Sequence, residues 1–237
     1  MIALGAIAPH GDVGETAELR AAMEELGRRV EAAGCDAAVV VTPHNVHVEG
    51  HFAVVTSSRI GSHPVDRGLA SALVTAIRLA GLPVVGVSYG GNDPQQAEMP
   101  LDWGTEVPLG FVRTDSLAVV SPARDRPLDE HIALGAAIAA ATRERRAVLV
   151  ASADHGHAHD PDGPYGFDPA AAAYDALFQE LLAREPLDFR PLAELVEPAK
   201  ADSLWQLLVL QGAVSGQAEL LAYAAPTYYG MAVATVG

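Results

Sequence analysis

The stretch Ala37-Ala38-Val39-Val40-Val41-Thr42-Pro43-His44 decides the fold that this sequence can adopt. Five apolar residues run without interruption and then stop at a proline followed by a histidine. A strand that is buried on both faces of a parallel sheet reads as such a continuous run. Two further runs, Ile2–Ile7 and Ala147–Ala151, have the same character and are also followed closely by histidines. The sequence therefore predicts parallel strands whose carboxyl ends carry chemically active side chains.

Helical patterns alternate with these strands along the chain. Leucine, methionine and valine recur at helical spacing from Thr16 to Ala33, with Gly34 as the expected C-cap. Further helices are expected at Val65–Ala80, Leu128–Arg143, Pro169–Ala183 and Ser203–Gly212, and further strands at Phe52–Thr56, Val84–Val87, Pro108–Val112, Leu117–Val120 and Met231–Thr235. Gly90–Thr105 is expected to be a functional loop. This alternation predicts an α/β fold: a single catalytic domain over residues 1–237, with a central, mostly parallel or mixed sheet and helices on both faces.

Composition narrows the function further. The 237 residues are 50% hydrophobic, and 15 basic against 30 acidic residues give a formal charge of −15. Such a charge argues against nucleic acid or an anionic membrane as a partner and favours a small neutral or metal-bound substrate. The single cysteine, Cys35, cannot form an internal disulfide, so we expect a cytoplasmic protein. We find no apolar stretch of about 18 residues that would span a bilayer.

Two X-Pro-His turns follow predicted strands, one ending at His10 and the other at His44. Proline fixes its own φ and restricts the residue before it, so each turn aims an imidazole away from a strand end. One such turn alone is best interpreted as a loop, but two after equivalent strands favour metal ligands. With one carboxylate they would form the facial site typical of non-haem Fe(II) oxygenases. His47 and His51 are interpreted as surface residues or as supports for the ligands, with Glu49 able to fix an imidazole tautomer.

The segment Ser152–Asp160 is the densest in polar chemistry. His157 with Asp154 three residues earlier suggests a general acid or base oriented by a carboxylate. The alternatives are a second metal-binding loop or a merely hydrophilic loop, to which His155 and His159 are assigned. The following turn-rich loop contains Tyr165 and Phe167, either of which would cover a substrate if the loop acts as a lid; an ordinary surface turn is the alternative.

These motifs together resemble the class III extradiol ring-cleavage dioxygenase superfamily, the family of the protocatechuate 4,5-dioxygenase β subunit, whose relatives include the DOPA-dioxygenase-like and Memo-like proteins. The resemblance covers nearly the whole chain. It rests on Pro9-His10, Pro43-His44, Asp102-Trp103-Gly104-Thr105-Glu106-Val107-Pro108-Leu109, Ser152-Ala153-Asp154-x-x-His157 and Gly212-Ala213-Val214. Each motif is short, but their order and spacing are fairly specific.

The resemblance implies a set of site residues. In that family two histidines and a Glu bind Fe(II), with His or Cys as the third ligand in some branches, and here His10 and His44 match the two histidines. The third ligand falls near Asp202, with Glu197 as the alternative; Asp202 would also suit a helix N-cap. His157 matches the acid–base histidine, while Trp103 stands where the family often has a second histidine. An indole exchanges no proton near neutral pH, so we expect Trp103 to stack on an aromatic ring or wall the pocket, beside Tyr165.

The resemblance implies an Fe(II)-dependent extradiol-type dioxygenase that cleaves a catechol- or aminophenol-like ring with O2. The alternatives are a zinc-binding hydrolase-like enzyme, because the same ligands suit Zn(II), and a non-enzymatic Memo-like scaffold. The expected partners are a small aromatic substrate and O2, and we expect a homo-oligomer or pairing with a second subunit. Arg59 and Arg67 are the candidates for a carboxylate anchor.

Overall fold

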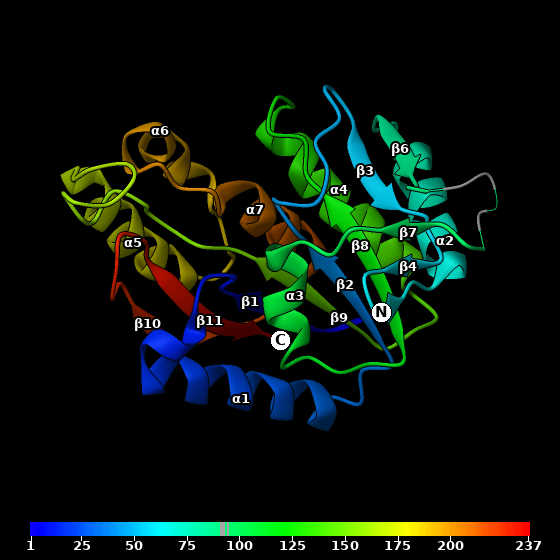
Figure 1. Cartoon of the computed structure of the whole chain (residues 1–237), viewed down its shortest axis with the longest axis horizontal. Coiled ribbons are helices and arrows are strands. Elements are labelled where there is room, and N and C mark those ends of the chain that lie inside the picture. The colour runs from blue at the N-terminus through cyan, green and yellow to red at the C-terminus, as the bar shows by residue number, and fades with distance from the viewer. Residues whose placement is uncertain (91–92, 94) are drawn as a thin grey trace.

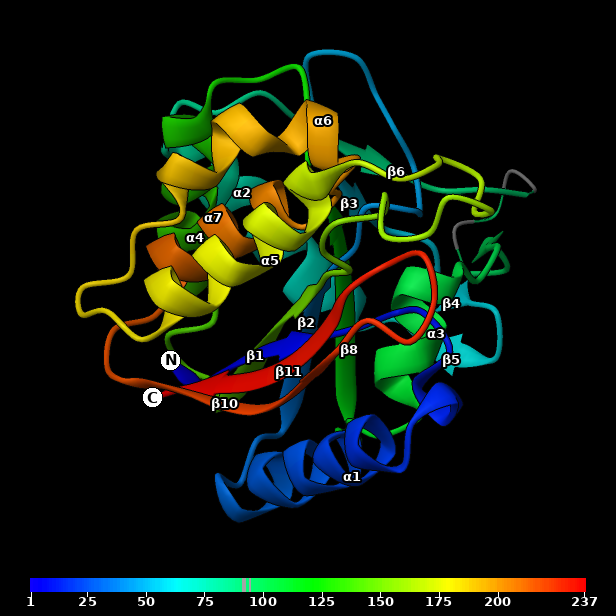
Figure 2. The ribbon, with the colours of Figure 1, turned by 90° about the vertical axis from the view of Figure 1, so that its left-hand side faces the viewer.

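A computed structural model describes residues 1–90, 93 and 95–237. Its centre is one large mixed sheet with helices on both faces, so the predicted α/β fold class and flanked sheet are confirmed (Figure 1). Figure 2, turned by 90°, shows α1 on one side of the sheet and α4, α5 and α7 together on the other. Gly91, Asn92 and Pro94 of the expected loop Gly90–Thr105 lie outside the described residues.

The main sheet has eight strands in the order β10-β11-β1-β9-β2-β8-β3-β6. β1, β9, β2 and β8 run parallel, whereas β11 and β3 join them antiparallel. A small second sheet has the order β5-β4-β7. The strands are β1 (Ile2–Ala8), β2 (Ala37–Val41), β3 (Phe52–Val55), β4 (Arg59–Ile60), β5 (His63–Pro64), β6 (Val84–Val87), β7 (Glu98–Met99), β8 (Ser116–Ser121), β9 (Ala147–Ser152), β10 (Ala218–Ala224) and β11 (Met231–Val236).

The helices pack against the sheet and against one another through buried apolar side chains. The helices are α1 (Ala17–Ala32), α2 (Arg67–Leu79), α3 (Trp103–Leu109), α4 (Leu128–Ala141), α5 (Pro169–Leu182), α6 (Val196–Ala199) and α7 (Leu204–Ala213), with 3-10 turns at Val13–Glu15 and Arg190–Leu195. α1 contacts β11 and β1, while α7 packs on α4, β9 and β1. Among the described helices, none is both long and apolar enough to cross a membrane.

The prediction of a strand at Pro108–Val112 was wrong, and so was the prediction of a loop up to Thr105. Residues Trp103–Leu109 form helix α3, which the Asp102 carboxylate caps by accepting from the Thr105 backbone N–H. Pro108 sits inside that helix, where a proline is usually excluded because it removes a hydrogen bond. The sequence pattern therefore did not indicate this short helix, whose stability comes from its cap and its tertiary contacts.

The sheet order brings the predicted histidine turns together. β9 lies between β1 and β2, and all three strands point their carboxyl ends the same way. Neighbouring strands lie about 4.8 Å apart, so the ends of β1 and β2 are separated by roughly 10 Å, a gap that two inward-turned imidazoles can close. The carboxyl edge of these three strands is therefore the place to look for a site.

Candidate metal centre

His10, His44 and Asp202 meet at this edge. The His10 and His44 Nε2 atoms lie 3.0 Å apart, and Asp202 Oδ2 lies 3.3 Å from the first and 3.4 Å from the second. His10 follows β1, His44 follows β2, and Asp202 precedes α7 by two residues. The three residues singled out from the sequence as metal ligands are thus brought together, and ligand atoms from all three lie within 4.8 Å of one another.

The spacing of these atoms fits a metal ion. Ligands at about 2.1 Å from one ion are separated by about 3.0 Å when their bonds meet at right angles and by about 3.4 Å in a tetrahedron. The three observed separations lie in this range. Asp202 Oδ1 is buried and has no hydrogen-bond partner among the described residues, as expected of a carboxylate oxygen that would contact a bound ion. Two imidazoles and one carboxylate are the donor set of a facial site with open positions.

Asp202 does not act as the helix cap that its position suggests. The N-cap residue of α7 is Ser203, which makes no side-chain capping hydrogen bond, and the Asp202 carboxylate faces His10 and His44 instead. Burial alone would raise the pKa of Asp202, but the two histidines hold it well below its usual range. The alternative ligand Glu197 is exposed on α6. Asp202, whose carboxylate is buried and faces both histidines, is therefore the better candidate for the third ligand.

Asp154 supports His10 rather than His157. Its Oδ1 accepts from the His10 backbone N–H at 3.1 Å, and its Oδ2 lies 3.4 Å from His10 Nε2. Burial would lower the pKa of His10, but Asp154 and Asp202 outweigh it and raise the pKa to about 9. Burial raises the pKa of Asp154 itself to about 6, against the pull of His10. The Asp154 carboxylate therefore contacts His10 and not, as predicted, His157, whose Nδ1 lies at the His155 carbonyl.

His157 is held by a backbone carbonyl. Its Nδ1 lies 2.7 Å from the carbonyl oxygen of His155, an acceptor only, so Nδ1 carries the proton and Nε2 is left free to accept one. The ring is surrounded by three tyrosines, with centroid distances of 5.7 Å to Tyr229 and 6.0 Å to both Tyr165 and Tyr228. The sequence analysis found Tyr165 but missed the pair at 228–229, since nothing local distinguishes it from the end of a hairpin.

Helix α3 packs against the turn that carries His44. The Trp103 indole lies 4.5 Å from the His44 ring, tilted by 36°, and is 57% exposed. Asp102 accepts from the Thr42 hydroxyl at 2.8 Å and from the Asn45 amide at 2.9 Å, which ties the helix to the turn that carries His44. Trp103 therefore packs against a ligand histidine, but it is not among the described lining residues of the cleft beside that histidine.

His44 and Asp202 line a cleft of about 290 Å³ whose charge the sequence analysis missed. It is lined by His44, Arg124, His157, Tyr165, Val196, Glu197, Lys200, Ala201, Asp202 and Trp205. Among its described lining residues the basic ones are Arg124 and Lys200, not Arg59 or Arg67. Arg124 lies 4.6 Å above the Trp205 ring. Lys200 is the single lysine of the sequence, so neither composition nor spacing marked it in advance.

Lys200 also stands out by its backbone. Its φ of 54° and ψ of 33° place it in the left-handed region at the end of α6. Glycine or asparagine normally occupies such a position, since other side chains crowd the backbone there. Strained residues of this kind cluster at ligand sites.

The remaining histidines of the dense segment are structural. His155 is fully buried, stacks on Phe178 at 4.0 Å and has its Nδ1 3.1 Å from the Ser203 hydroxyl. Burial lowers its pKa to about 4, so the ring is neutral. His159 Nε2 lies 2.8 Å from Asp175, which belongs to α5. His47 and His51 are exposed, as the surface interpretation expected.

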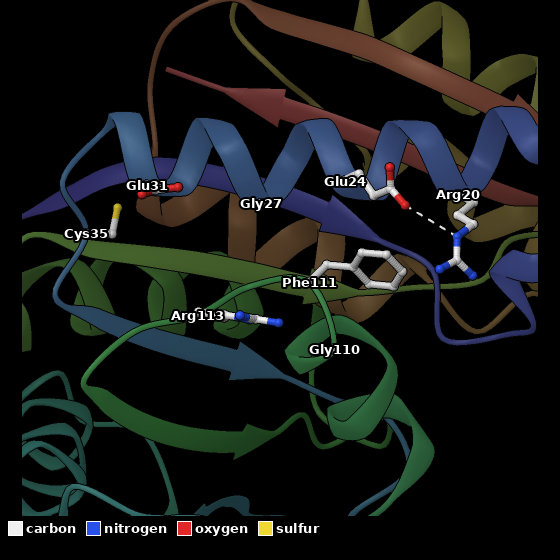
Figure 3. Close-up of a pocket in the computed structure, with 8 residues that line it drawn as sticks. All are labelled: Arg20, Glu24, Gly27, Glu31, Cys35, Gly110, Phe111 and Arg113. Atoms are coloured by element: carbon white, nitrogen blue, oxygen red, sulfur yellow. Dashed lines mark hydrogen bonds and ion pairs between the residues drawn. The ribbon is translucent and has the colours of Figure 1, made fainter.

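A larger cavity lies away from this chemistry. It measures about 650 Å³ and lies between α1 and the residues that follow α3 (Figure 3). Glu24, Glu31, Arg20 and Arg113 line it together with Cys35, and Figure 3 shows the Arg20–Glu24 pair. Its acidic and basic groups are exposed side chains on the surface, and no histidine is among its lining residues. The smaller cleft, which is lined by His44, Asp202 and His157, is therefore the candidate site.

Comparisons with known proteins show the family and the fold of the chain. The family model described as "Catalytic LigB subunit of aromatic ring-opening dioxygenase" matches residues 7–236. The crystal structure of uncharacterized protein JW3007 from Escherichia coli K12 superposes with a TM-score of 0.71 at 20% sequence identity and covers 99% of each chain. That identity establishes the fold alone. No curated protein matches the chain in sequence.

Proposed function

Because this chain belongs to the family of the catalytic LigB subunit of aromatic ring-opening dioxygenases, we propose that it is an Fe(II)-dependent extradiol-type dioxygenase. Its substrate is a catechol- or aminophenol-like ring, which it cleaves with O2. The observation that carries the proposal is the convergence of His10, His44 and Asp202 from three separate segments on one point. Such a convergence of buried ligands is costly unless an ion is bound there.

The three ligands would hold the ion and leave part of its coordination sphere free. When bound, Fe(II) supplies the electron transfer that lets O2 react with a chelated ring. The chain's own contribution is orientation. Tyr165 lies beside His157 and lines the cleft with Trp205, so aromatic side chains would contact a flat ring bound there.

His157 is the proposed acid–base residue. Its Nδ1 proton is committed to the His155 carbonyl, so Nε2 takes a proton from the substrate hydroxyl and later returns it. The same hydrogen bond fixes the ring orientation. A carboxylate is not needed for this task, because the carbonyl already determines which nitrogen is basic.

The cationic side chains of the cleft favour an acidic substrate. In a chain of net charge −15, the only lysine and Arg124 both line the cleft that His44 and Asp202 also line. Arg124 and Lys200 form no ion pair with any described residue, so both charges are available to a ligand. A catechol that carries a carboxylate would place its hydroxyls at the metal and its acid group at these cations.

Anaerobic reconstitution with Fe(II) tests the proposal. The expected result is near-stoichiometric iron and oxygen consumption with a panel of catechols and aminophenols, accompanied by a yellow ring-cleavage product. An iron-loaded protein that consumes no oxygen with any member of the panel contradicts it. Stoichiometric zinc in the isolated protein, together with that failure, would point to the hydrolase-like alternative, and absence of any bound metal would point to the scaffold.

A further inference from the structure

We propose that Ser152 is a positioning residue that fixes the tautomer of His10, and that Pro108 keeps free the Gly104 carbonyl to which the Ser152 hydroxyl donates. The proposal deepens the metal site and therefore rests on the proposed function. Ser152 ends β9, the strand between the two that carry the histidine ligands, and its side chain is fully buried. It touches both His10 and helix α3.

The number of protons at Ser152 decides the direction of its hydrogen bonds. The hydroxyl donates to the carbonyl oxygen of Gly104 at 2.5 Å, and a carbonyl can only accept. The one hydroxyl proton is thus in use. His10 Nδ1 lies 3.1 Å from the same oxygen, so Ser152 must accept there and His10 must carry its proton on Nδ1. The consequence is a lone pair on His10 Nε2 when the ring is neutral.

That lone pair points where it is needed. Nε2 is the His10 atom that faces His44 and Asp202. With the opposite tautomer, an N–H would occupy this position and the ring could not ligate a metal. Among the described residues, Ser152 is the hydrogen-bond partner of Nδ1, so no second group shares the task. Metal histidines generally need such a partner at the other ring nitrogen.

Pro108 explains why the Gly104 carbonyl is free. In an α-helix the carbonyl of residue 104 accepts from the N–H of residue 108, but proline has none. The orphaned carbonyl of α3 turns to Ser152 instead. Gly104 lets the helix approach this closely, because a Cβ there would lie 2.3 Å from Thr42 Oγ1 and 3.3 Å from His44 Cδ2. The Gly104 carbonyl that Pro108 leaves free is thus linked to His10 by two hydrogen bonds through Ser152.

The main test is Ser152→Ala, with Zn(II) as a diamagnetic probe of affinity. We expect the dissociation constant to rise by about 10–100-fold, the usual effect of losing such a partner. In two-bond ¹H–¹⁵N spectra of the zinc-loaded wild type, His10 should be protonated at Nδ1 with slow exchange, and that proton should exchange rapidly in the variant. Ser57→Ala is the matched control, since Ser57 is equally buried and its hydroxyl accepts from the Tyr89 N–H.

A second variant, Pro108→Ala, leaves Ser152 and His10 in place. Its new N–H would compete for the Gly104 carbonyl, so zinc affinity should fall by less than in Ser152→Ala. Thermal stability should stay equal or rise, because proline is unfavourable inside a helix. Pro100→Ala, which changes an exposed proline outside α3, is the control. Loss of affinity with unchanged stability is an effect that a purely structural role would not produce.

The outcomes separate the two proposals. If wild type binds zinc and iron but Ser152→Ala, correctly folded, binds them equally well, the positioning role of Ser152 is wrong and the metal site stands. The role is also refuted if zinc-loaded wild type shows His10 protonated at Nε2. If wild type binds no metal, the proposed function fails first. If Ser152→Ala does not fold, the ¹H–¹⁵N spectrum of wild type and the affinity of Pro108→Ala still decide the matter.

Discussion

His10 Nε2 lies 3.0 Å from His44 Nε2, although the two residues follow strands that are not neighbours in the sheet. β9 separates β1 from β2, and both imidazoles lean over its end to meet. Two ring nitrogens at this distance, beside a buried carboxylate, form a site that a bound cation would complete.

Removal of any proposed ligand should abolish stoichiometric metal. We expect His10→Ala, His44→Ala and Asp202→Asn each to lose bound iron after anaerobic reconstitution, measured by elemental analysis. Asp202→Asn keeps the shape of the side chain and removes only the charge. His47→Ala, an exposed histidine three residues from His44, should keep full metal content. Unchanged iron in any of the three ligand variants would remove that residue from the site.

Metal binding should strengthen with rising pH. The neighbouring carboxylates raise the pKa of His10 to about 9 in the metal-free protein, so a proton must leave Nε2 before it can ligate. Zinc affinity measured by competition with a chelator should increase by about tenfold per pH unit up to that pKa. A flat profile between pH 7 and 9 would show that His10 is already neutral.

The same shift predicts a change in stability of the metal-free protein. Protonated His10 is favoured in the folded state, since its pKa there exceeds the ordinary value of 6.5. The stabilisation is therefore fully present below about pH 6.5 and is lost as the pH rises through about 9. Thermal unfolding of the metal-free wild type should reveal this loss, and the pH profile of His10→Ala should lack it.

Replacement of the acid–base histidine should separate chemistry from metal binding. His157→Gln should keep its iron but lose about 10²–10⁴-fold in kcat, the usual contribution of a positioned proton acceptor. Asp154→Asn, by contrast, should weaken metal binding, because Asp154 holds His10 and not His157. If iron-loaded His157→Gln turned over at the wild-type rate, the assigned role would be wrong.

The cationic cleft should select for acidic catechols. We expect 3,4-dihydroxybenzoate to be preferred in kcat/KM over its neutral methyl ester by about tenfold. Lys200→Met and Arg124→Gln should each reduce that preference while leaving turnover of the ester near its wild-type value. Arg126→Gln is the control, because its guanidinium is already paired with Glu130. Equal preference in wild type and both variants would contradict the assignment.

The lid can be tested with a built-in control. Tyr165 is 56% exposed and lines the cleft beside His157, whereas Phe167 is 62% exposed and is not among the cleft's described lining residues. Tyr165→Ala should therefore raise KM, and Phe167→Ala should not. If both variants match wild type, the loop is only a surface turn.

The sequence determined the layered fold and the position of the site. Uninterrupted apolar runs at Ala37–Val41 and Ala147–Ala151 could only be buried strands, and the Pro-His turns that follow β1 and β2 could only lie at their carboxyl ends. The helix at Trp103–Leu109 could not be read in the same way. It contains a proline and is too short to show a period, so its cap and its contacts with Ser152 and Thr42 determine it.

The same distinction between sequence and tertiary structure holds for the residues of the site. The residue types and their order in the chain identified His10, His44 and His157, because a histidine that closely follows a predicted strand can be recognised from the local sequence alone. Only the tertiary structure shows that Asp154 contacts His10, that the His157 ring hydrogen-bonds to a backbone carbonyl, and that Arg124 and Lys200 line one cleft. Hydrogen-bond direction and charge proximity depend on distances between segments far apart in sequence, and these distances exist only once the sheet order sets β9 between β1 and β2.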